Sequence, residues 1–192
     1  MRRCGVEDKC NVVGGVDLSG TPKRPTGIAI VREGVLIYAD KVFYDDEIID
    51  ILRRYSTCLV AIDAPLSMAK TYRKVDLAMK KRGFKVLPPG WRGMRILTLR
   101  AMRIKRILEA MGIKVIETHP SSAIKSSGLH DIVKLIEFFV KVYDWSFATK
   151  GKDVVDAVIA ACVAWSYVQG RSMIVKEIDG EIHLLPQVSL IR

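Results

Sequence analysis

The sequence predicts an α/β fold built on a mixed β-sheet. Short apolar segments with turn residues beside them recur along the 192-residue chain, a pattern typical of strands, and longer segments with helical apolar spacing separate several of them. Strands joined by a tight turn run antiparallel, and strands joined through a helix run parallel, so a chain with both connections forms a mixed sheet. We expect five strands flanked by helices, with an extra hairpin at the C-terminal end.

The first half of the chain contains four of these strands and one helix. Segments 11–18, 26–32 and 35–43 are largely apolar, and the sequence REG between the last two predicts a hairpin. Segment 45–56 begins with acidic residues and has arginines near its end, a distribution that favours a helix. Segment 58–65 is continuously apolar, which indicates a strand that is buried on both faces.

The second half is mainly helical. Segments 70–83 and 94–112 have helical spacing and end at glycine. Segment 113–120 is the fifth strand, which ends at a proline. After a serine-rich turn, we expect helices near 130–143 and over 152–170.

The last predicted element is a hairpin over 172–186 that turns at an Asp-Gly pair. The sequence has no internal repeat, low-complexity tract or clear linker. We therefore predict a single domain over 1–192, with a basic helical insert at about 67–112 between the fourth and fifth strands.

Positive charge is concentrated in one part of the chain. The net charge is +10, and from Lys70 to Arg106 there are 13 basic residues and a single acid, Asp76. Such a segment attracts nucleic acid through phosphate neutralisation and counterion release. A solvated helix face explains the charge equally well.

Three predicted strands end in an acidic residue, namely Asp17, Asp63 and Glu117. Parallel strands that are neighbours end at the same edge of a sheet, which is where open α/β sheets bind ligands. A single acid at a strand end is usually explained by a turn or a helix cap. Three acids at one edge indicate a site.

The last predicted helix adds Asp153 and Asp156, whose spacing places them on one face. An N-cap role explains Asp153 as well as a site does. Asp156 lies among apolar residues, and a buried carboxylate needs a cationic partner. Acidic clusters bind Mg²⁺ or Mn²⁺, and these ions promote phosphodiester hydrolysis.

Five motifs between about residues 11 and 169 resemble a known family. The segments GVDLSG, AIDAPLS, YRKVD, IETHP and KDVVDAVIAA, in this order, resemble the ribonuclease H-like "predicted nuclease" proteins grouped as domain-of-unknown-function family 429. The closing Asp-x-x-Asp-Ala is also similar to that of Holliday-junction resolvases. The resemblance implies a ribonuclease H-like sheet, with three antiparallel strands followed by two parallel strands, and an acidic cluster that binds a divalent metal.

The resemblance also implies roles for individual residues. The metal ligands would be Asp17, Asp63, Glu117 and Asp156, and Asp153 would complete the catalytic acids. Ribonuclease H proper carries a further acid in its first helix, whereas segment 45–56 offers none that is clearly placed, so the ligand count stays open.

Basic residues would bind the substrate. The resemblance implies that Arg73 clamps a phosphate and that His119 contacts the substrate or orients Glu117, and an ordinary structural role is open for both. Lys74 and Arg92 belong to the basic segment that would hold a nucleic-acid backbone.

The function predicted from these features is a Mg²⁺- or Mn²⁺-dependent nuclease that acts on DNA or RNA. One alternative is a nucleotide-binding or phosphotransfer protein, because GVDLSGTPK resembles the first phosphate loop of sugar kinases and actin-like ATPases. Those proteins need two such domains, and the chain has no Walker A pattern. The other alternative is a nucleic-acid-binding protein without catalysis. Junction resolvases act as dimers, so a homodimer is also open.

The remaining composition suggests where the protein works. The beginning of the chain has no secretory pattern and the longest apolar stretch is too short to span a membrane, so we expect a cytoplasmic protein with no membrane partner. Few amide and many charged residues favour a thermophilic source. The cysteine spacing does not fit zinc. We expect Cys58 and Cys162 in the core, and a Cys4–Cys10 disulfide is open.

Overall fold

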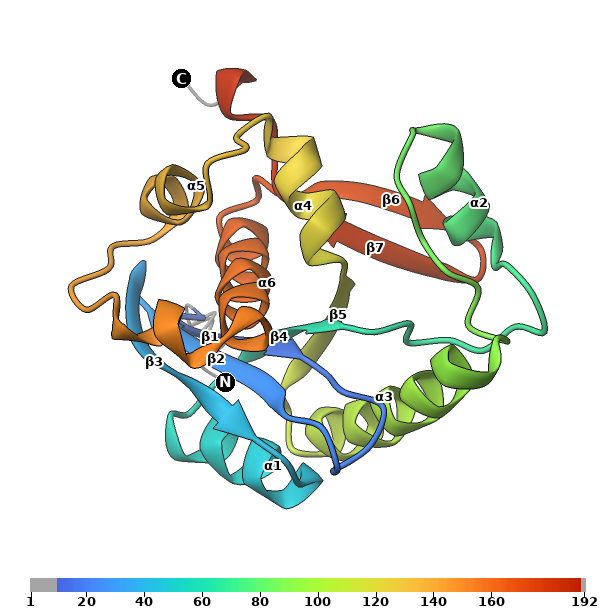
Figure 1. Ribbon diagram of the computed structural model, residues 1–192, viewed down its shortest axis with the longest axis horizontal. Coiled ribbons are helices and arrows are strands. Elements are labelled where there is room, and N and C mark those ends of the chain that lie inside the picture. The colour runs from blue at the N-terminus through green and yellow to red at the C-terminus, as the bar shows by residue number, and fades with distance from the viewer. Residues whose placement is uncertain (1–9, 191–192) are drawn as a thin grey trace, which may run out of the picture.

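The computed structural model describes residues 10–190 and contains one mixed sheet covered by helices on both faces (Figure 1). The strand order across the sheet is β3-β2-β1-β4-β5-β7-β6. β1 is antiparallel to β2 and parallel to β4, and β4 is parallel to β5. The three antiparallel strands followed by two parallel ones that the sequence predicts are therefore present. The strands are β1 (Val12–Asp17), β2 (Thr26–Arg32), β3 (Val35–Val42), β4 (Leu59–Asp63), β5 (Lys114–Thr118), β6 (Met173–Glu177) and β7 (Gly180–Leu184).

The sheet has seven strands, not the five predicted. The C-terminal hairpin was expected outside the five-stranded sheet. Instead, β7 pairs in parallel with β5, and β6 forms the new edge of the sheet. Without this pairing, the outer backbone groups of β5 would be exposed as an open edge. The sequence predicts the hairpin through its turn, but the turn says nothing about which strand the hairpin joins.

The helices lie close to their predicted positions, with one addition. They are α1 (Asp45–Arg54), α2 (Lys74–Lys81), α3 (Arg92–Ala110), α4 (Pro120–Ser127), α5 (Ile132–Phe139) and α6 (Lys152–Val168), with short 3-10 turns at Ser146–Lys150 and Val188–Leu190. None of the helices in the described part of the chain is long and apolar enough to cross a bilayer.

Helix α4 occupies the segment predicted as a serine-rich turn. Pro120 is its first residue, a position where the missing N–H costs nothing, and Gly128 ends it in the left-handed conformation. The hydroxyls of Ser126 and Ser127 donate to the carbonyls of Ala123 and Ile124 within the same helix. The serines were therefore compatible with a helix because their hydroxyls bond to its own backbone.

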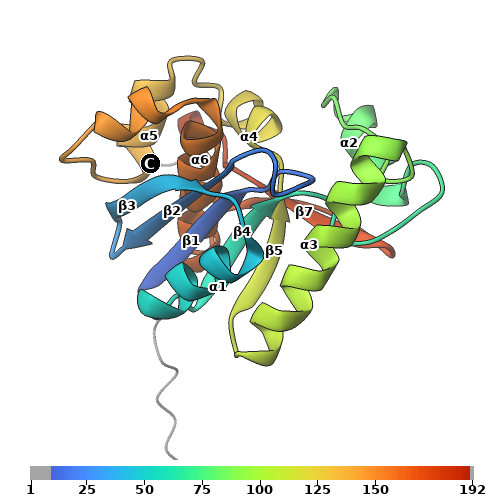
Figure 2. The same cartoon turned by 60° about the horizontal axis from the view of Figure 1, so that its bottom comes forward.

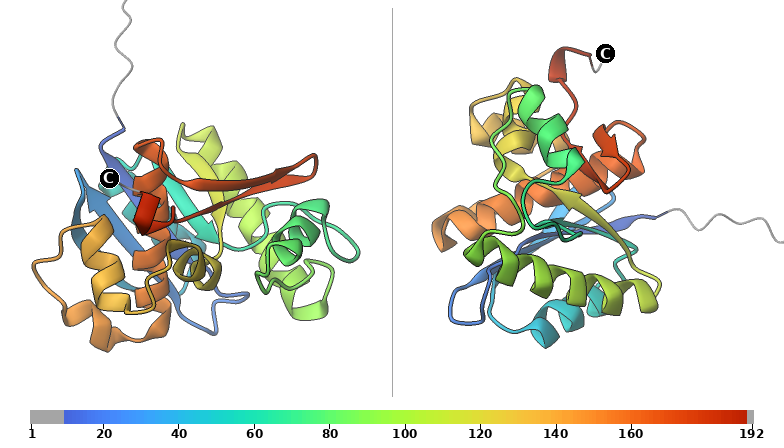
Figure 3. Two further views of the ribbon diagram at one scale, coloured as in Figure 1. Left: turned by 90° about the horizontal axis from the view of Figure 1, so that it is seen from above. Right: turned by 90° about the vertical axis from the view of Figure 1, so that its right-hand side faces the viewer.

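The helices form a layer on each face of the sheet (Figures 2 and 3). On one face, α4, α5 and α6 pack with alternate strand residues such as Val13, Ala61 and Ile116. On the other face, α1 and α3 pack with the intervening residues of the same strands, such as Ile62 and Val115. This alternation is the two-residue period of a strand, and it decides which face each strand-end acid points to.

Two glycines let helix α6 lie directly against the strands. A Cβ atom on Gly15 would lie 2.1 Å from the carbonyl oxygen of Ala157, and one on Gly27 would lie 1.9 Å from the carbonyl oxygen of Asp153. No side chain fits between these backbones. The close approach brings the beginning of α6 beside the end of β1, where Asp17 is located.

We expect Gly15→Ala to destabilise the protein by at least about 1–3 kcal/mol, because a methyl group would have to push α6 away from β1. Urea unfolding at neutral pH measures the change. Gly93→Ala is the matched control: it lies in α3, where an added Cβ would meet no atom within 4 Å, and should stabilise by up to about 1 kcal/mol. Equal stability of the two variants would contradict a backbone contact between α6 and β1.

The sequence left the pairing of the cysteines open. Cys10 forms a disulfide with Cys58, which was expected in the core and is partly buried, so Cys10 is not available for a bond to Cys4. The two cysteines precede β1 and β4, which are parallel neighbours, so the strands bring them together. Cys4 itself lies outside the described residues. Cys162 is a free, buried cysteine, as predicted.

Candidate active site

The ends of β1 and β4 place two carboxylates side by side. Asp17 and Asp63 are direct partners in the parallel register of the two strands. Val13 of β1 and Ala61 of β4 pack in the core on the face that α6 covers. Asp17 and Asp63 are an even number of residues further along the same strands, so both point towards that face. Two carboxylates predicted from separate parts of the sequence therefore meet at one edge of the sheet.

Helix α6 adds a third carboxylate and a cation. Asp156 is 8% exposed and forms an ion pair with Lys152, one turn earlier in the helix. The sequence predicts a cationic partner for Asp156, with a metal ion in that role, and in the structure Lys152 is the partner. Asp153 borders a separate cavity with Asp17 but not the cavity that Asp17 shares with Asp63.

The three carboxylates repel one another. Burial raises the pKa of Asp17 to about 7, and the charges of Asp156 and Asp153 add to this effect. Burial also raises the pKa of Asp63 well above its usual range, again with contributions from Asp17 and Asp156. Lys152 acts in the opposite direction on both residues. Displaced pKa values of this kind are typical of functional sites.

Glu117 borders the same cavity but points to the other face of the sheet. It pairs with Ile62 rather than with Asp63, so the strand period turns its side chain away from α6. The structure therefore places Asp17, Asp63 and Asp156 near enough for their charges to act on one another, and it turns Glu117 away from them.

Both oxygens of Glu117 are bound within the protein. They accept hydrogen bonds from the Arg73 guanidinium at 2.7 and 2.5 Å, and the backbone N–H of Leu66 adds one at 2.8 Å. The guanidinium supplies the positive charge that this buried carboxylate needs. The ligand role of Glu117 stays a prediction, because its side chain lies on the other face of the sheet from Asp17 and Asp63.

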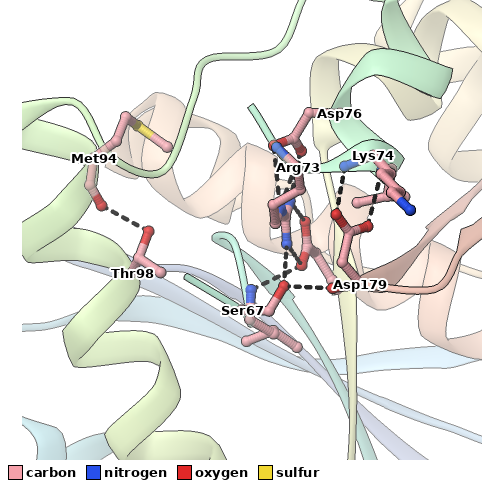
Figure 4. Close-up of polar contacts among 10 residues, drawn as sticks. Ser67, Arg73, Lys74, Asp76, Met94, Thr98 and Asp179 are labelled. Atoms are coloured by element: carbon pink, nitrogen blue, oxygen red, sulfur yellow. Dashed lines mark hydrogen bonds and ion pairs between the residues drawn. The ribbon is translucent and has the colours of Figure 1, made fainter. Parts of the chain in front are cut away.

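Arg73 is buried between two carboxylates instead of facing solvent. It is 3% exposed, and it contacts Asp76 as well as Glu117, with a distance of 2.7 Å between Nη2 and Asp76 Oδ1 (Figure 4). Burial alone would lower the pKa of the guanidinium, but the hydrogen bonds to Glu117 and Asp76 outweigh it and raise the pKa. The phosphate-clamp role predicted for Arg73 is not compatible with this position, because its donors are already used within the protein.

The same network contains two residues for which the sequence predicted no role in the site. Asp179, in the β6–β7 turn, accepts hydrogen bonds from the backbone N–H groups of Lys74 and Val75 at the beginning of α2. Ser67 donates to the Asp179 carbonyl and accepts from Arg73 (Figure 4). The Asp-Gly pair is explained by the turn alone, so the sequence held no signal that this carboxylate caps a distant helix.

The other predicted substrate-binding residues lie around the site. His119 is partly buried beside the cavity, and its Nδ1 is 2.7 Å from the Ser122 hydroxyl. Burial lowers the pKa of His119, which favours a neutral ring. Lys74 and Arg92 are exposed at the first positions of α2 and α3.

The donor set suits a hard divalent cation, although the side chains are not gathered around one. Between residues 10 and 190, no three His, Cys, Asp or Glu side chains are grouped closely enough to hold a metal ion as they lie. Asp17, Asp63 and Asp156 nevertheless offer only oxygen ligands, and burial, together with the charges of neighbouring acids, raises the pKa values of Asp17 and Asp63. Mg²⁺ and Mn²⁺ prefer such ligands.

The fold and the position of the acids together define a ribonuclease H-like α/β protein with a carboxylate cluster at the sheet edge. Among solved structures, the chain is similar to RuvC from Thermus thermophilus, with a TM-score of 0.53 and 16% identity over 83% of this chain and 96% of that chain. It is also similar to Thermus thermophilus RuvC in complex with a Holliday junction substrate, with a TM-score of 0.51 and 17% identity over the same shares. At this identity the similarity establishes the fold.

The comparisons support a fold shared with RuvC but not the narrower family. No protein-family model matches the chain, and no curated protein sequence matches it. Membership of family 429 stays a prediction.

Proposed function

We propose that this protein is a divalent-metal-dependent nuclease that hydrolyses phosphodiester bonds, with branched nucleic acid as its preferred substrate. The observation that carries the proposal is that Asp17 and Asp63 end two neighbouring parallel strands, close enough to Asp156 of α6 for the three charges to act on one another. Thermus thermophilus RuvC has the same fold and binds a Holliday junction, which supports a branched substrate.

The three carboxylates would hold the metal. Mg²⁺ or Mn²⁺ supplies an activated water and stabilisation of the leaving oxygen when bound at such a site. Glu117 is left out of this ligand set because Arg73 holds both of its oxygens. Its role is to anchor α2 and the β6–β7 hairpin beside the site. Lys152 balances the charge of Asp156 in the absence of metal.

Only some of the basic residues in segment 70–106 would bind the nucleic-acid backbone. Arg73 and Arg100 are buried, and Arg100 is bonded to Asp45 and to the Ser19 and Phe43 carbonyls. They therefore support the fold rather than contact phosphates. The other basic residues of the segment are exposed or partly exposed, among them Lys70, Lys74, Arg92, Arg95 and Arg106.

A cleavage assay tests the proposal. We expect end-labelled four-way junctions to be cut in Mg²⁺ or Mn²⁺ and to stay intact in EDTA, with slower cutting of flaps and single strands of DNA or RNA. Binding should weaken steeply with salt, since the exposed lysines and arginines would displace counterions. Tight, salt-dependent binding with no product from any substrate would instead indicate the binding protein without catalysis.

A further inference from the structure

The cavity that contains Asp17 and Asp63 has two unlike sides. Its volume is about 190 Å³. One side carries Asp17 and Asp63, two of the three carboxylates of the candidate site. The other side is apolar and comes from the loop before α3 and the first turns of that helix, through Val86, Leu87, Met94 and Leu97.

The apolar side is partly open to solvent, because Leu87 is 53% exposed although it lines the cavity. Three residues of the same segment that do not line the cavity, Trp91, Ile96 and Leu99, are also between about half and three-fifths exposed. Large exposed apolar groups beside a polar site indicate a surface that contacts a ligand. Contact of these groups with water is unfavourable, whereas covering them with a flat apolar ligand removes apolar surface from water and lowers the free energy.

The backbone holds this apolar side in place. Pro88 and Pro89 are buried or partly buried, and Gly90 lies so close to the preceding loop that a Cβ atom on it would be 1.8 Å from the Lys70 carbonyl oxygen. The Thr98 hydroxyl donates to the Met94 carbonyl at 2.7 Å (Figure 4). The side chains of Leu87 and Met94 are therefore presented to the cavity by a fixed segment.

The size and chemistry of the cavity select the ligand. Typical ligand pockets measure about 300–1,000 Å³, so this smaller space suits one ring system rather than a whole nucleotide. A nucleobase is flat, with apolar faces that stack on side chains. A phosphate attached to it would extend towards the carboxylate side, where the proposed function places the reaction.

We propose that this cavity takes one unstacked nucleobase of the substrate strand, so that the protein acts where a base is unpaired rather than on continuous duplex. The inference rests on the proposed function for the class of ligand. In a duplex every base is stacked and paired, and extruding one costs energy that an already unpaired base does not require. Leu87 and Met94 would contact the faces of the base.

The test is a binding measurement in EDTA, where no cleavage takes place. Fluorescence anisotropy would compare a DNA duplex that carries one unpaired adenine with the same duplex carrying an abasic site at that position. We expect the wild-type protein to bind the adenine form about 5- to 20-fold more tightly, as burial of the apolar face of the base against Leu87 and Met94 predicts. Leu87→Ala combined with Met94→Ala should remove this difference.

Leu99→Ala is the matched control, because Leu99 is also 53% exposed but does not line the cavity. It should keep the preference for the adenine form, and thermal unfolding should confirm that all variants are folded. Equal binding of the two duplexes by the wild-type protein, or an equal loss in the Leu99 variant, would overturn the inference.

The result is separable from the proposed function. A preference for the adenine form without cleavage of any substrate in Mg²⁺ would support the base site and reject the nuclease. Cleavage in Mg²⁺ without any preference for the unpaired base would keep the nuclease and reject the base site.

Discussion

Replacing Asp17 with asparagine is expected to abolish metal-dependent cleavage and to stabilise the metal-free protein at neutral pH. Cleavage should fall by about 10³-fold or more, because Asp17 lies at the centre of the proposed ligand set and an amide cannot replace a charged oxygen ligand. Stability should rise because the variant removes one of three repelling carboxylates. Asp50→Asn, an exposed acid on α1, is the control and should change neither quantity.

The stability of the wild-type protein should depend on pH in a direction that the pKa of Asp17 determines. The pKa of Asp17 is raised to about 7 in the folded protein, from an ordinary value of 3.8. The folded state therefore binds the proton more tightly, and the free energy of unfolding should fall as the pH rises from about 4 to 7 and level off above that. A shift of this size corresponds to at most about 4 kcal/mol, and because Asp17 is partly exposed we expect roughly 1–2 kcal/mol.

Urea unfolding from pH 4 to 8 in EDTA measures this effect. Asp17→Asn should lose part of the decline between pH 4 and 7, and Mg²⁺ should stabilise the wild-type protein much more than the variant. A variant that is less stable than wild type at pH 7, or that still cuts nucleic acid at the wild-type rate, would show that Asp17 is not part of a charged cluster.

Replacing Arg73 with methionine is expected to destabilise the protein by about 3–5 kcal/mol, because it leaves the buried carboxylates of Glu117 and Asp76 without a partner. Lysine should not restore the stability, since it cannot contact both oxygens of Glu117 at once. Adding Glu117→Gln to Arg73→Met should recover part of the loss by removing one unpaired charge.

An exposed pair in the same protein provides the control for Arg73. Arg53 and Asp50 are also three residues apart, with an N–O distance of 2.8 Å against 2.7 Å for Arg73 and Asp76, but their side chains are 69% and 55% exposed instead of 2% each. Arg53→Met should cost less than about 1 kcal/mol. Similar losses for Arg53→Met and Arg73→Met would mean that burial of the Arg73 network does not matter.

Most strand and helix positions followed from local patterns in the sequence. The strand Thr26–Arg32 was predicted with its observed bounds, and α6 was predicted from its apolar run and its first-turn acid. Helix α4 was missed because a serine-rich segment after a proline favours a turn as much as a helix. The helix is stabilised by hydrogen bonds from serine hydroxyls to backbone carbonyls, and these bonds form only once the helix exists.

The candidate site was predictable in part. Asp17 and Asp63 stood out because each ends a strand that the crossover rule makes parallel, and their meeting depends only on neighbouring strands. Glu117 shares this pattern, yet the register of β5 is displaced by one residue relative to Asp63, which turns its side chain to the other face.

The sequence by itself determined the α/β class, the mixed sheet and the residues from which a carboxylate site is built, because strand and helix periods and strand-end acids are local properties. Only the tertiary structure decided which acids meet, that Arg73 is buried, that Asp179 caps α2, that Cys10 bonds to Cys58, and that β7 extends the sheet beside β5. Each of these depends on strand register and on contacts between segments far apart in the chain, and local patterns do not encode them.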